Sequence, residues 1–318
     1  CTHLIAIDQS GPIDYRSLLA EARSEIEAAG HLRTIVLMGQ QLDGTTPWQQ
    51  LLDRGEDITD ADLAERAASV DPDQLMMLAY TSGTTGLSKG VMHSLSSLRE
   101  AAGGVGLMGD TRPGSRFISY LPLAHLAERV VVQTHAAVFG GTVYFNESQE
   151  SFLNDMRNAR PNWMLGVPRI WEKLQQVVLA HLVSLEELEA AKANGTVEEV
   201  AGKVRQFLGL DEVQYILTST APTPAPLKSW YDDLAITLYD GYGQSEILPV
   251  CGNVVGNRKV DSIGIASPGV EIKIAEDGEI LARGGGTAMG YYNAPDKTAE
   301  TFEPDGWVHT GDRGRVDE

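Results

Sequence analysis

The feature that most constrains the fold is an alternation of short apolar runs with stretches of helical periodicity, which extends to about residue 250. The apolar runs predict strands at residues 34–38, 75–80, 116–120, 142–145, 163–167, 213–218 and 236–239. The periodic stretches predict helices at residues 15–29, 95–103, 126–139, 168–182, 185–208 and 226–234. Strands and helices in alternation are typical of layered proteins with mostly parallel sheets, so we expect an α/β fold.

The sequence changes character after Val250, where glycines and short alternating strands predominate. We expect strands at residues 270–275 and 279–283, and Asp277-Gly278 between them predicts the turn of a β-hairpin. The chain is therefore expected to have an α/β core at residues 1–250 and a β-rich subdomain at residues 251–318. Within the core, residues 185–208 predict a solvated surface excursion of two helices joined at Asn194-Gly195.

The overall charge excludes some classes of partner. The 318 residues carry a formal net charge of −19, and such an acidic surface repels nucleic acid and anionic membranes. No apolar run reaches the roughly 18 residues of a membrane helix, although an apolar patch could still make peripheral contact with lipid. Two cysteines, Cys1 and Cys251, form no disulfide framework, which favours a reducing cytoplasm.

The stretch TSGTTGLSKG at residues 81–90 predicts a phosphate-binding loop. It follows an apolar strand, its glycines let backbone N–H groups approach an anion, and its lysine supplies a positive charge. The spacing of Gly86 and Lys89 does not match the P-loop pattern G-x-x-x-x-G-K-[ST], so a P-loop NTPase is not supported. The residues predicted to cradle phosphate are Thr81, Ser82, Gly83, Thr84, Thr85, Gly86 and Lys89.

Other candidate motifs are set aside. Residues 104–109 match G-x-G-x-x-G but follow a helical stretch, so we expect a glycine-rich loop that ends this helix and no dinucleotide site. Ser245 lacks the second glycine of a nucleophile elbow. The histidines show no metal-ligand spacing.

The phosphate loop resembles the signature T-[ST]-G-[ST]-T-G-x-P-K-G of the AMP-forming acyl-CoA synthetase, or adenylate-forming, superfamily, with Ser88 in place of the usual proline. Further stretches resemble motifs of this superfamily in the same order: YLPLAH at 120–125, TSTAP at 218–222, YDGYGQSE at 239–246, GEILARG at 278–284 with MGY at 289–291, and GWVHTGD at 306–312. The stretches at 119–130 and 166–174 are similar to its long-chain fatty-acyl branch. The order of the motifs, from about residue 75 onward, carries the resemblance.

The resemblance implies roles for individual residues. Lys89, Ser245 and Glu246 would be catalytic, with Ser245 contacting the α-phosphate and Glu246 holding Mg²⁺. Tyr242 would pack on adenine, Asp312 would bind the ribose hydroxyls, and His125 would line the carboxylate pocket. Besides the phosphate loop, the implied nucleotide-binding residues are Ala221, Pro222, Tyr242, Gly243, Gln244, Ser245 and Asp312.

The resemblance also implies a reaction in which a carboxylic acid, expected to be a long-chain fatty acid, reacts with ATP to form an acyl-adenylate and then a coenzyme A thioester. In the superfamily, a hinge and a small C-terminal domain with a further lysine follow the T-G-D motif. This chain stops six residues after Asp312 and does not begin with Met, so we expect a fragment cut at both ends that lacks this domain. Such a fragment is expected to bind ATP and to catalyse adenylation poorly.

Three alternatives stay open at this point. The first is an adenylating enzyme for aryl, amino or luciferin-type acids. The second is a nucleotide-binding module without catalysis. The third is a P-loop NTPase, which would produce ADP and not AMP.

Overall fold

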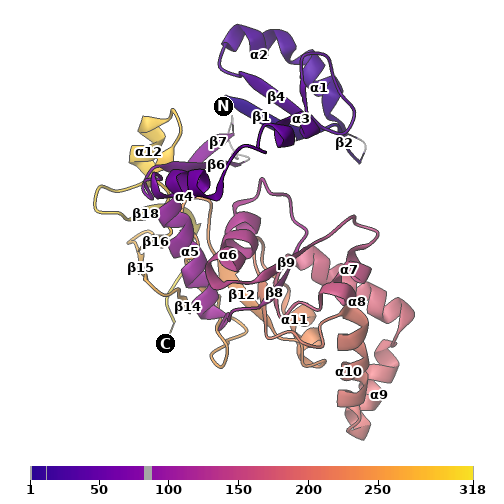
Figure 1. Cartoon of the computed structure of the whole chain (residues 1–318). Coiled ribbons are helices and arrows are strands. Elements are labelled where there is room, and N and C mark those ends of the chain that lie inside the picture. The colour runs from indigo at the N-terminus through magenta and orange to yellow at the C-terminus, as the bar shows by residue number, and fades with distance from the viewer. Residues whose placement is uncertain (1, 12, 82–87, 318) are drawn as a thin grey trace. The chain divides into compact units, whose positions relative to one another are not determined.

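The computed structural model describes residues 2–11, 13–81 and 88–317, and it divides into two compact units at residues 1–71 and 72–318 (Figure 1). The predicted α/β class is confirmed, because parallel strands alternate with helices in both units. The separate subdivision at residue 250 stays a prediction. Among the described residues, no helix combines the length and apolar character that a membrane crossing needs.

The first unit is built on a parallel three-stranded sheet in the order β1-β4-β5. The predicted strand at 34–38 is β4 with the same bounds, and its Val36 and Leu37 are buried. The predicted helix at 15–29 is interrupted at Ala22 and forms two helices, α1 and α2. The elements are β1 (His3–Ile7), β2 (Gln9–Ser10), β3 (Ile13–Asp14), α1 (Tyr15–Glu21), α2 (Arg23–Ala29), β4 (Thr34–Met38), β5 (Thr46–Pro47), α3 (Trp48–Asp53) and α4 (Asp60–Ala68).

The second unit begins with an antiparallel hairpin and continues as alternating strands and helices. Its elements up to residue 242 are β6 (Leu75–Thr81), β7 (Lys89–Ser94), α5 (Leu95–Met108), β8 (Arg116–Ser119), the π-helical segment η1 (Glu128–Thr134), α6 (His135–Phe139), β9 (Thr142–Phe145), α7 (Phe152–Ala159), β10 (Trp163–Gly166), α8 (Pro168–His181), α9 (Leu185–Asn194), α10 (Val197–Leu208), β11 (Tyr215–Thr218), α11 (Ala225–Asp232) and β12 (Leu238–Tyr242). The later elements are β13 (Cys251–Gly252), β14 (Ile265–Ala266), β15 (Val270–Ile274), β16 (Glu279–Gly284), β17 (Gly290–Tyr291), α12 (Pro295–Thr301) and β18 (Val308–Arg313).

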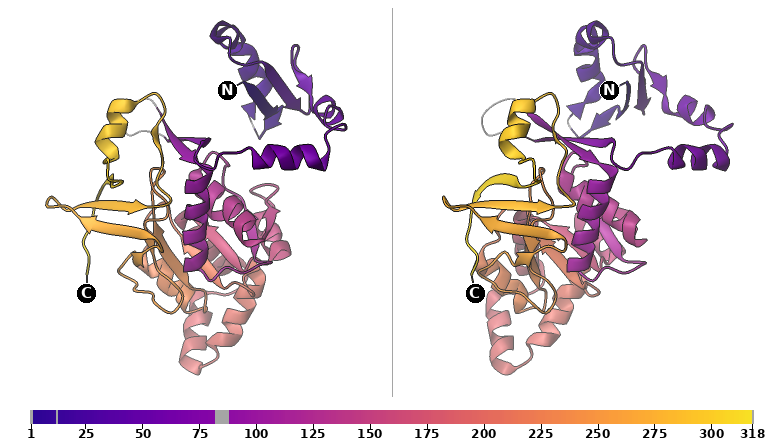
Figure 2. Two further views of the ribbon diagram at one scale, coloured as in Figure 1. Left: turned by 60° about the vertical axis from the view of Figure 1, so that its left-hand side comes forward. Right: turned by 90° about the vertical axis from the view of Figure 1, so that its left-hand side faces the viewer.

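The central sheet of the second unit has the strand order β10-β11-β12-β13-β14. Strands β10, β11 and β12 are parallel, and every residue of β10 and β11 is buried. Strands buried on both faces are typical of a parallel sheet covered by helices, and the largest apolar cluster includes residues of α8, α10 and α11. Two antiparallel sheets, β15-β16-β18 and β17-β7-β6, and the parallel pair β8-β9 complete the unit. Strands β15 and β16 are drawn in light orange in Figure 2.

Two expectations about the helices were wrong. Helix α5 does not end in a loop at residue 103 but continues through Gly104 and Gly106 to Met108. A Cβ atom at Gly106 would lie 2.3 Å from the Phe139 ring, so this glycine allows α5 and α6 to approach closely. The helices α9 and α10 meet at Gly195 as predicted, but they are more than a solvated excursion, since each buries one face in the core.

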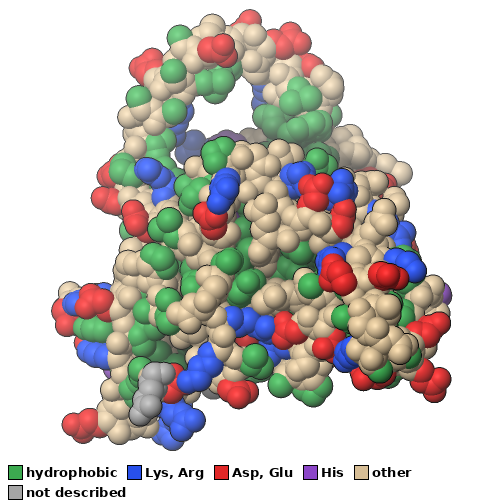
Figure 3. Space-filling view, turned by 90° about the horizontal axis from the view of Figure 1, so that it is seen from below, with side chains coloured by type: hydrophobic (Ala, Val, Ile, Leu, Met, Phe, Trp, Pro, Cys, Tyr) green, Lys and Arg blue, Asp and Glu red, His purple; other side chains and the backbone are tan. Residues whose placement is uncertain are grey.

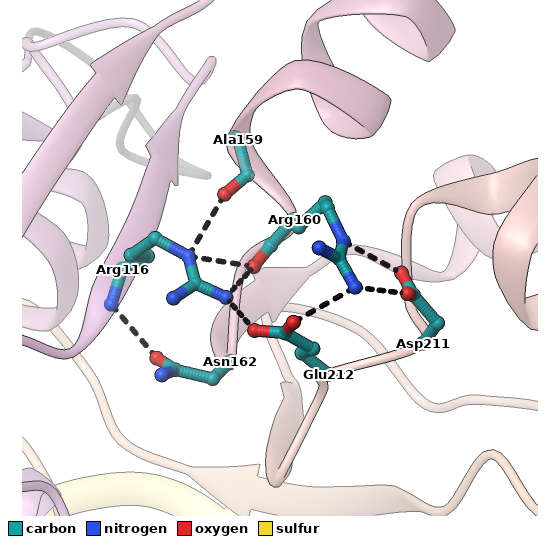
Figure 4. Close-up of polar contacts among 6 residues, drawn as sticks. All are labelled: Arg116, Ala159, Arg160, Asn162, Asp211 and Glu212. Atoms are coloured by element: carbon teal, nitrogen blue, oxygen red, sulfur yellow. Dashed lines mark hydrogen bonds and ion pairs between the residues drawn. The ribbon is translucent and has the colours of Figure 1, made fainter.

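A network of ion pairs joins α7, β8 and the loop before β11 (Figure 4). Arg160 ends helix α7 in a left-handed conformation and contacts the carboxylates of Asp211 and Glu212. Arg116 also contacts Glu212, and its backbone N–H donates to Asn162 Oδ1 at 2.7 Å. Two arginines and two carboxylates therefore stabilise one edge of the core.

The network predicts a stability that depends on pH. Hydrogen bonds from Arg160 lower the pKa of Asp211, so this carboxylate stabilises the folded state above its unfolded pKa of about 3.9 and loses that effect as the pH falls further. Asp211→Asn should lower the free energy of unfolding by about 1 kcal/mol or less at pH 7, because these side chains are partly exposed. Urea unfolding should show that this difference shrinks as the pH falls from about 4 to about 2. A difference that stays constant over this range would contradict the prediction.

Candidate functional site

A cavity of about 750 Å³ lies beyond the C-terminal ends of the parallel strands β11 and β12. Ligands of α/β proteins bind at this edge of the sheet. The first wall is the turn after β11, which holds Ala221 and Pro222, and the second is the end of β12, which holds Tyr242, Gly243 and Gln244. The remaining walls are contributed by residues 260–263, Ile280, Asp312 and Arg313.

Three predicted residues of this cavity are hydrogen-bonded to one another. Asp312 Oδ2 accepts from the Tyr242 hydroxyl at 2.6 Å and from Gln244 Nε2 at 2.7 Å. Gln244 Nε2 also donates to the Thr310 carbonyl at 2.8 Å. Within the described part of the chain no hydrogen bond reaches Asp312 Oδ1, so the carboxylate is oriented while one oxygen stays available to a ligand hydroxyl.

A buried ion pair that the sequence did not predict closes one side of the cavity. Lys228 Nζ on α11 lies 2.7 Å from Asp240 Oδ2 on β12 and donates to the Val260 carbonyl at 2.9 Å. The two side chains are 7% and 15% exposed, so water screens their mutual attraction less than it screens a surface pair. Lys228 therefore connects α11, β12 and the loop near residue 260 around the cavity. Nothing in the sequence marked this lysine among the other lysines.

A second, narrow pocket adjoins the cavity and shares Ser219, Gly241 and Tyr242 with it. Its volume is about 20 Å³, and its other lining residues are Val105, Met108, Ala127, Val131, Leu165, Leu217, Leu248, Pro249 and Cys251. Burial raises the pKa of the Cys251 thiol to about 11, so this side chain is a neutral, apolar part of the wall. The polar cavity thus continues into an apolar slot.

Lys89, Ser245 and Glu246 do not line the cavity. The fold brings Lys89 and Glu246 to the same tyrosine, and Ser245 directly precedes Glu246 in the sequence. The hydroxyl of Tyr291 donates to Glu246 Oε1 at 2.6 Å, and Lys89 Nζ lies 4.7 Å from the centre of the Tyr291 ring. Thr81 and Lys89 pair across the β6–β7 hairpin, directly at the ends of the predicted phosphate loop. The predicted residues Ser82, Gly83, Thr84, Thr85 and Gly86 lie outside the described residues.

His93 on β7 supports the same region and was not predicted. Its ring is 2% exposed, and Nε2 lies 2.8 Å from the carbonyl oxygen of Ser245. Burial lowers the pKa of His93, so a neutral ring that donates from Nε2 fits this contact. The sequence could not predict this contact, because His93 and Ser245 are far apart in the chain and no local pattern links them.

His125 lies in the turn before η1, where its side chain is exposed. Its backbone N–H donates to the Pro122 carbonyl at 2.9 Å. The side chain lines neither the cavity nor the narrow pocket, whereas the nearby Ala127 lines the pocket. A substrate contact of His125 stays a prediction.

The described residues fit a Mg²⁺ ion that enters the site already bound to the phosphates of a substrate. Among the described residues, no cluster of three or more His, Cys, Asp or Glu side chains could hold a metal ion by itself. Glu246 has one oxygen bonded to Tyr291, which leaves Oε2 as a single carboxylate ligand. Mg²⁺ is commonly bound by one or two carboxylates together with phosphate oxygens and water, and Glu246 satisfies this protein contribution.

Comparison with known proteins shows the family of the chain. The family model described as AMP-binding enzyme matches residues 5–292. The long-chain-fatty-acid–CoA ligase ACSBG2 of Gallus gallus is 32% identical over 329 residues, covering 90% of this chain and 43% of the relative. The long-chain-fatty-acid–CoA ligase heimdall of Drosophila melanogaster is 30% identical over 363 residues, covering 99% of this chain and 53% of the relative.

Solved structures show the same fold. The anthranilate CoA ligase AuaEII in complex with anthranoyl-AMP matches with a TM-score of 0.76 and 20% identity, covering all of this chain (100%) and 57% of that one. ATP-bound MatB from Rhodopseudomonas palustris matches with a TM-score of 0.69 and 22% identity over the same shares.

The chain belongs to the AMP-binding enzyme family. Its curated relatives include long-chain-fatty-acid–CoA ligases, as the resemblance of residues 119–130 and 166–174 predicted. The family match begins at residue 5, so it also includes most of the N-terminal part in which the sequence offered no usable motif. The chain spans about half the length of the curated relatives that it matches.

Proposed function

We propose that this chain provides the ATP site of an enzyme that activates a long-chain fatty acid as an acyl-adenylate and transfers it to coenzyme A, releasing AMP and pyrophosphate. The observation that carries the proposal is that residues from three separate motifs line one cavity of about 750 Å³. They are Ala221, Pro222, Tyr242, Gly243, Gln244 and Asp312. Family membership and the names of the relatives support the reaction class.

The chemistry requires that two anions meet, because a fatty acid carboxylate must attack the α-phosphate of ATP. The new P–O bond forms as the bond to pyrophosphate breaks. The acyl group of the fatty acid then carries AMP, which is a better leaving group than the carboxylate oxygen. Tyr242 and Gln244 hold Asp312 ready for the ribose, which fixes the nucleoside. Lys89 stabilises negative charge on the phosphates, and positioning and electrostatics supply most of the rate. Mg²⁺ at Glu246 would neutralise further phosphate charge.

The narrow apolar pocket suits the acyl part of the substrate. It shares Ser219, Gly241 and Tyr242 with the cavity, so a carboxylate near the α-phosphate can place its tail among apolar side chains. A space of about 20 Å³ holds no long chain, so the pocket must widen as the acid enters. Met108 lies in the wall of this pocket, and its sulfur accepts a hydrogen bond from the Ser267 hydroxyl at 3.3 Å. An unbranched side chain such as methionine is well suited to move aside.

Met108→Ala should therefore shift the preference toward longer acids, by about tenfold in the ratio of palmitate to octanoate. The exchange of labelled pyrophosphate into ATP by the full-length protein, measured with each acid, gives this ratio. Met156→Ala is the matched control, because Met156 is also buried but lies in another part of the core. An unchanged ratio in Met108→Ala would contradict the placement of the acyl chain.

The experiment that tests the proposal is exchange of labelled pyrophosphate into ATP by the full-length protein, with parallel panels of fatty, aryl and amino acids. Exchange that depends on fatty acids supports the proposal, and exchange with aryl or amino acids alone would replace the substrate class. ATP binding without exchange for any acid would favour the non-catalytic module. For the 318 residues themselves we propose ATP binding with poor turnover, which rapid exchange would contradict.

A cytoplasmic location with peripheral membrane contact stays a prediction.

A further inference from the structure

Tyr291 belongs to the M-G-Y stretch, to which the proposed reaction gives no role. It ends the short strand β17, which pairs antiparallel with β7 so that Tyr291 faces Val91. The side chain is 4% exposed. The fold therefore places this tyrosine two residues from Lys89 across a strand pair.

Residues 288–291 form two hydrogen bonds with Glu246. The Ala288 N–H donates to the backbone carbonyl of Glu246 at 2.8 Å, and the Tyr291 hydroxyl donates to its Oε1 at 2.6 Å. A carboxylate can only accept, so the phenol is the donor. Backbone and side chain of Glu246 are thus both fixed by residues 288–291.

The Tyr291 ring also attracts the ammonium group of Lys89, which lies 4.7 Å from the ring centre. A cation at this distance is attracted by the negative face of an aromatic ring. Lys89 and Glu246 carry opposite charges, yet neither makes an ion pair with any residue that the structure describes. An ion pair between them would reduce the charge that each can offer to a ligand.

We propose that Tyr291 is a positioning residue that holds Lys89 on its ring and Glu246 on its hydroxyl, so that both charges stay available to the triphosphate and its Mg²⁺. The inference rests on the proposed function. It separates two contributions of one side chain, because the hydroxyl acts on Glu246 and the ring acts on Lys89.

Two substitutions distinguish these contributions. Tyr291→Phe removes the hydroxyl and keeps the ring. The Mg²⁺-dependent gain, which is the ratio of the ATP affinity with Mg²⁺ to that in EDTA, should fall about tenfold, and the affinity in EDTA should stay unchanged. Tyr291→Leu removes the ring as well and should also weaken binding in EDTA. Tyr292→Phe is the matched control, since this neighbouring tyrosine is 47% exposed, and it should bind like the unmodified chain.

Calorimetric titration with ATP, once with excess Mg²⁺ and once with EDTA, provides the measurement. In a Glu246→Gln background, Tyr291→Phe should cause no further loss of the Mg²⁺-dependent gain. If Tyr291→Phe binds like the unmodified chain, or loses affinity equally with Mg²⁺ and EDTA, the positioning role is wrong while the ATP site stands. If the unmodified chain binds no ATP under either condition, the proposed function fails and this inference fails with it.

Discussion

Asp312→Ala should weaken ATP binding by about 10- to 100-fold. The carboxylate accepts from Tyr242 and Gln244 through Oδ2, so the substitution removes the proposed ribose acceptor and also releases both neighbours. Tyr242 and Gln244 line the same cavity, so their loss of order adds to the effect. Calorimetric titration with ATP measures the change.

The control for this variant is Asp305→Ala, which removes an exposed carboxylate that does not line the cavity. Its affinity for ATP should equal that of the unmodified chain. Guanosine triphosphate serves as a second ligand, because ribose binding predicts a similar relative loss for both nucleotides in Asp312→Ala. An affinity for ATP within twofold of the unmodified chain would contradict a ribose contact at Asp312.

Trp171→Ala should lower the free energy of unfolding of the second unit by about 3–5 kcal/mol. Trp171 is fully buried, and its ring packs edge-on against Tyr231 with 5.6 Å between ring centres. A Cβ atom at Gly166 would lie 2.0 Å from this ring, so the end of β10 is shaped to accommodate the indole. The stretch GVPRIW is thus explained by packing as well as by the family resemblance.

Urea unfolding followed by circular dichroism measures this loss. Trp171→Phe is the informative comparison, because the indole N–H has no hydrogen-bond partner among the described residues and its removal relieves a buried polar group. The phenylalanine variant should therefore lose clearly less stability than the alanine variant. A loss below about 1 kcal/mol for Trp171→Ala would show that this cluster contributes little to the core.

Local patterns predicted most elements because each strand or helix shows its own periodicity. The strands β4 and β9 have the predicted bounds, and Gly195 separates α9 from α10 as expected. The prediction failed at Gly104 and Gly106, where helix propensity alone favours a break. Packing of α5 against Phe139 overrides that propensity, and such a contact cannot be read from the local sequence.

The site could be predicted only as separate motifs. Motif resemblance identified Tyr242, Gln244 and Asp312, but their hydrogen bonds appear only when β12 and β18 are folded together. The contact of Tyr291 with Glu246 depends on pairing of β17 with β7, two strands that are far apart in the sequence. The buried pair of Lys228 and Asp240 was missed for the same reason, because neither residue has a local pattern that points to the other.

Figure 3 shows how charged side chains are distributed over one face of the structure. On the face drawn in Figure 3, Lys and Arg side chains lie among Asp and Glu side chains and do not gather in one basic patch. Such a mixed face offers no extended positive field to a nucleic acid. Binding of a small anionic ligand at a local site, without nucleic acid as a partner, stays a prediction.

Hydrogen–deuterium exchange with and without Mg²⁺ and ATP tests the central claim most directly, because it locates the nucleotide on the chain. We predict slower exchange in three of the segments that line the cavity, residues 218–223, 240–244 and 312–313, and in residues 89–94 next to the phosphate loop. The Asp312→Ala variant should lose most of this protection at the same ATP concentration. Protection confined to other segments, or none at saturating ATP, would contradict the assignment of this cavity as the ATP site.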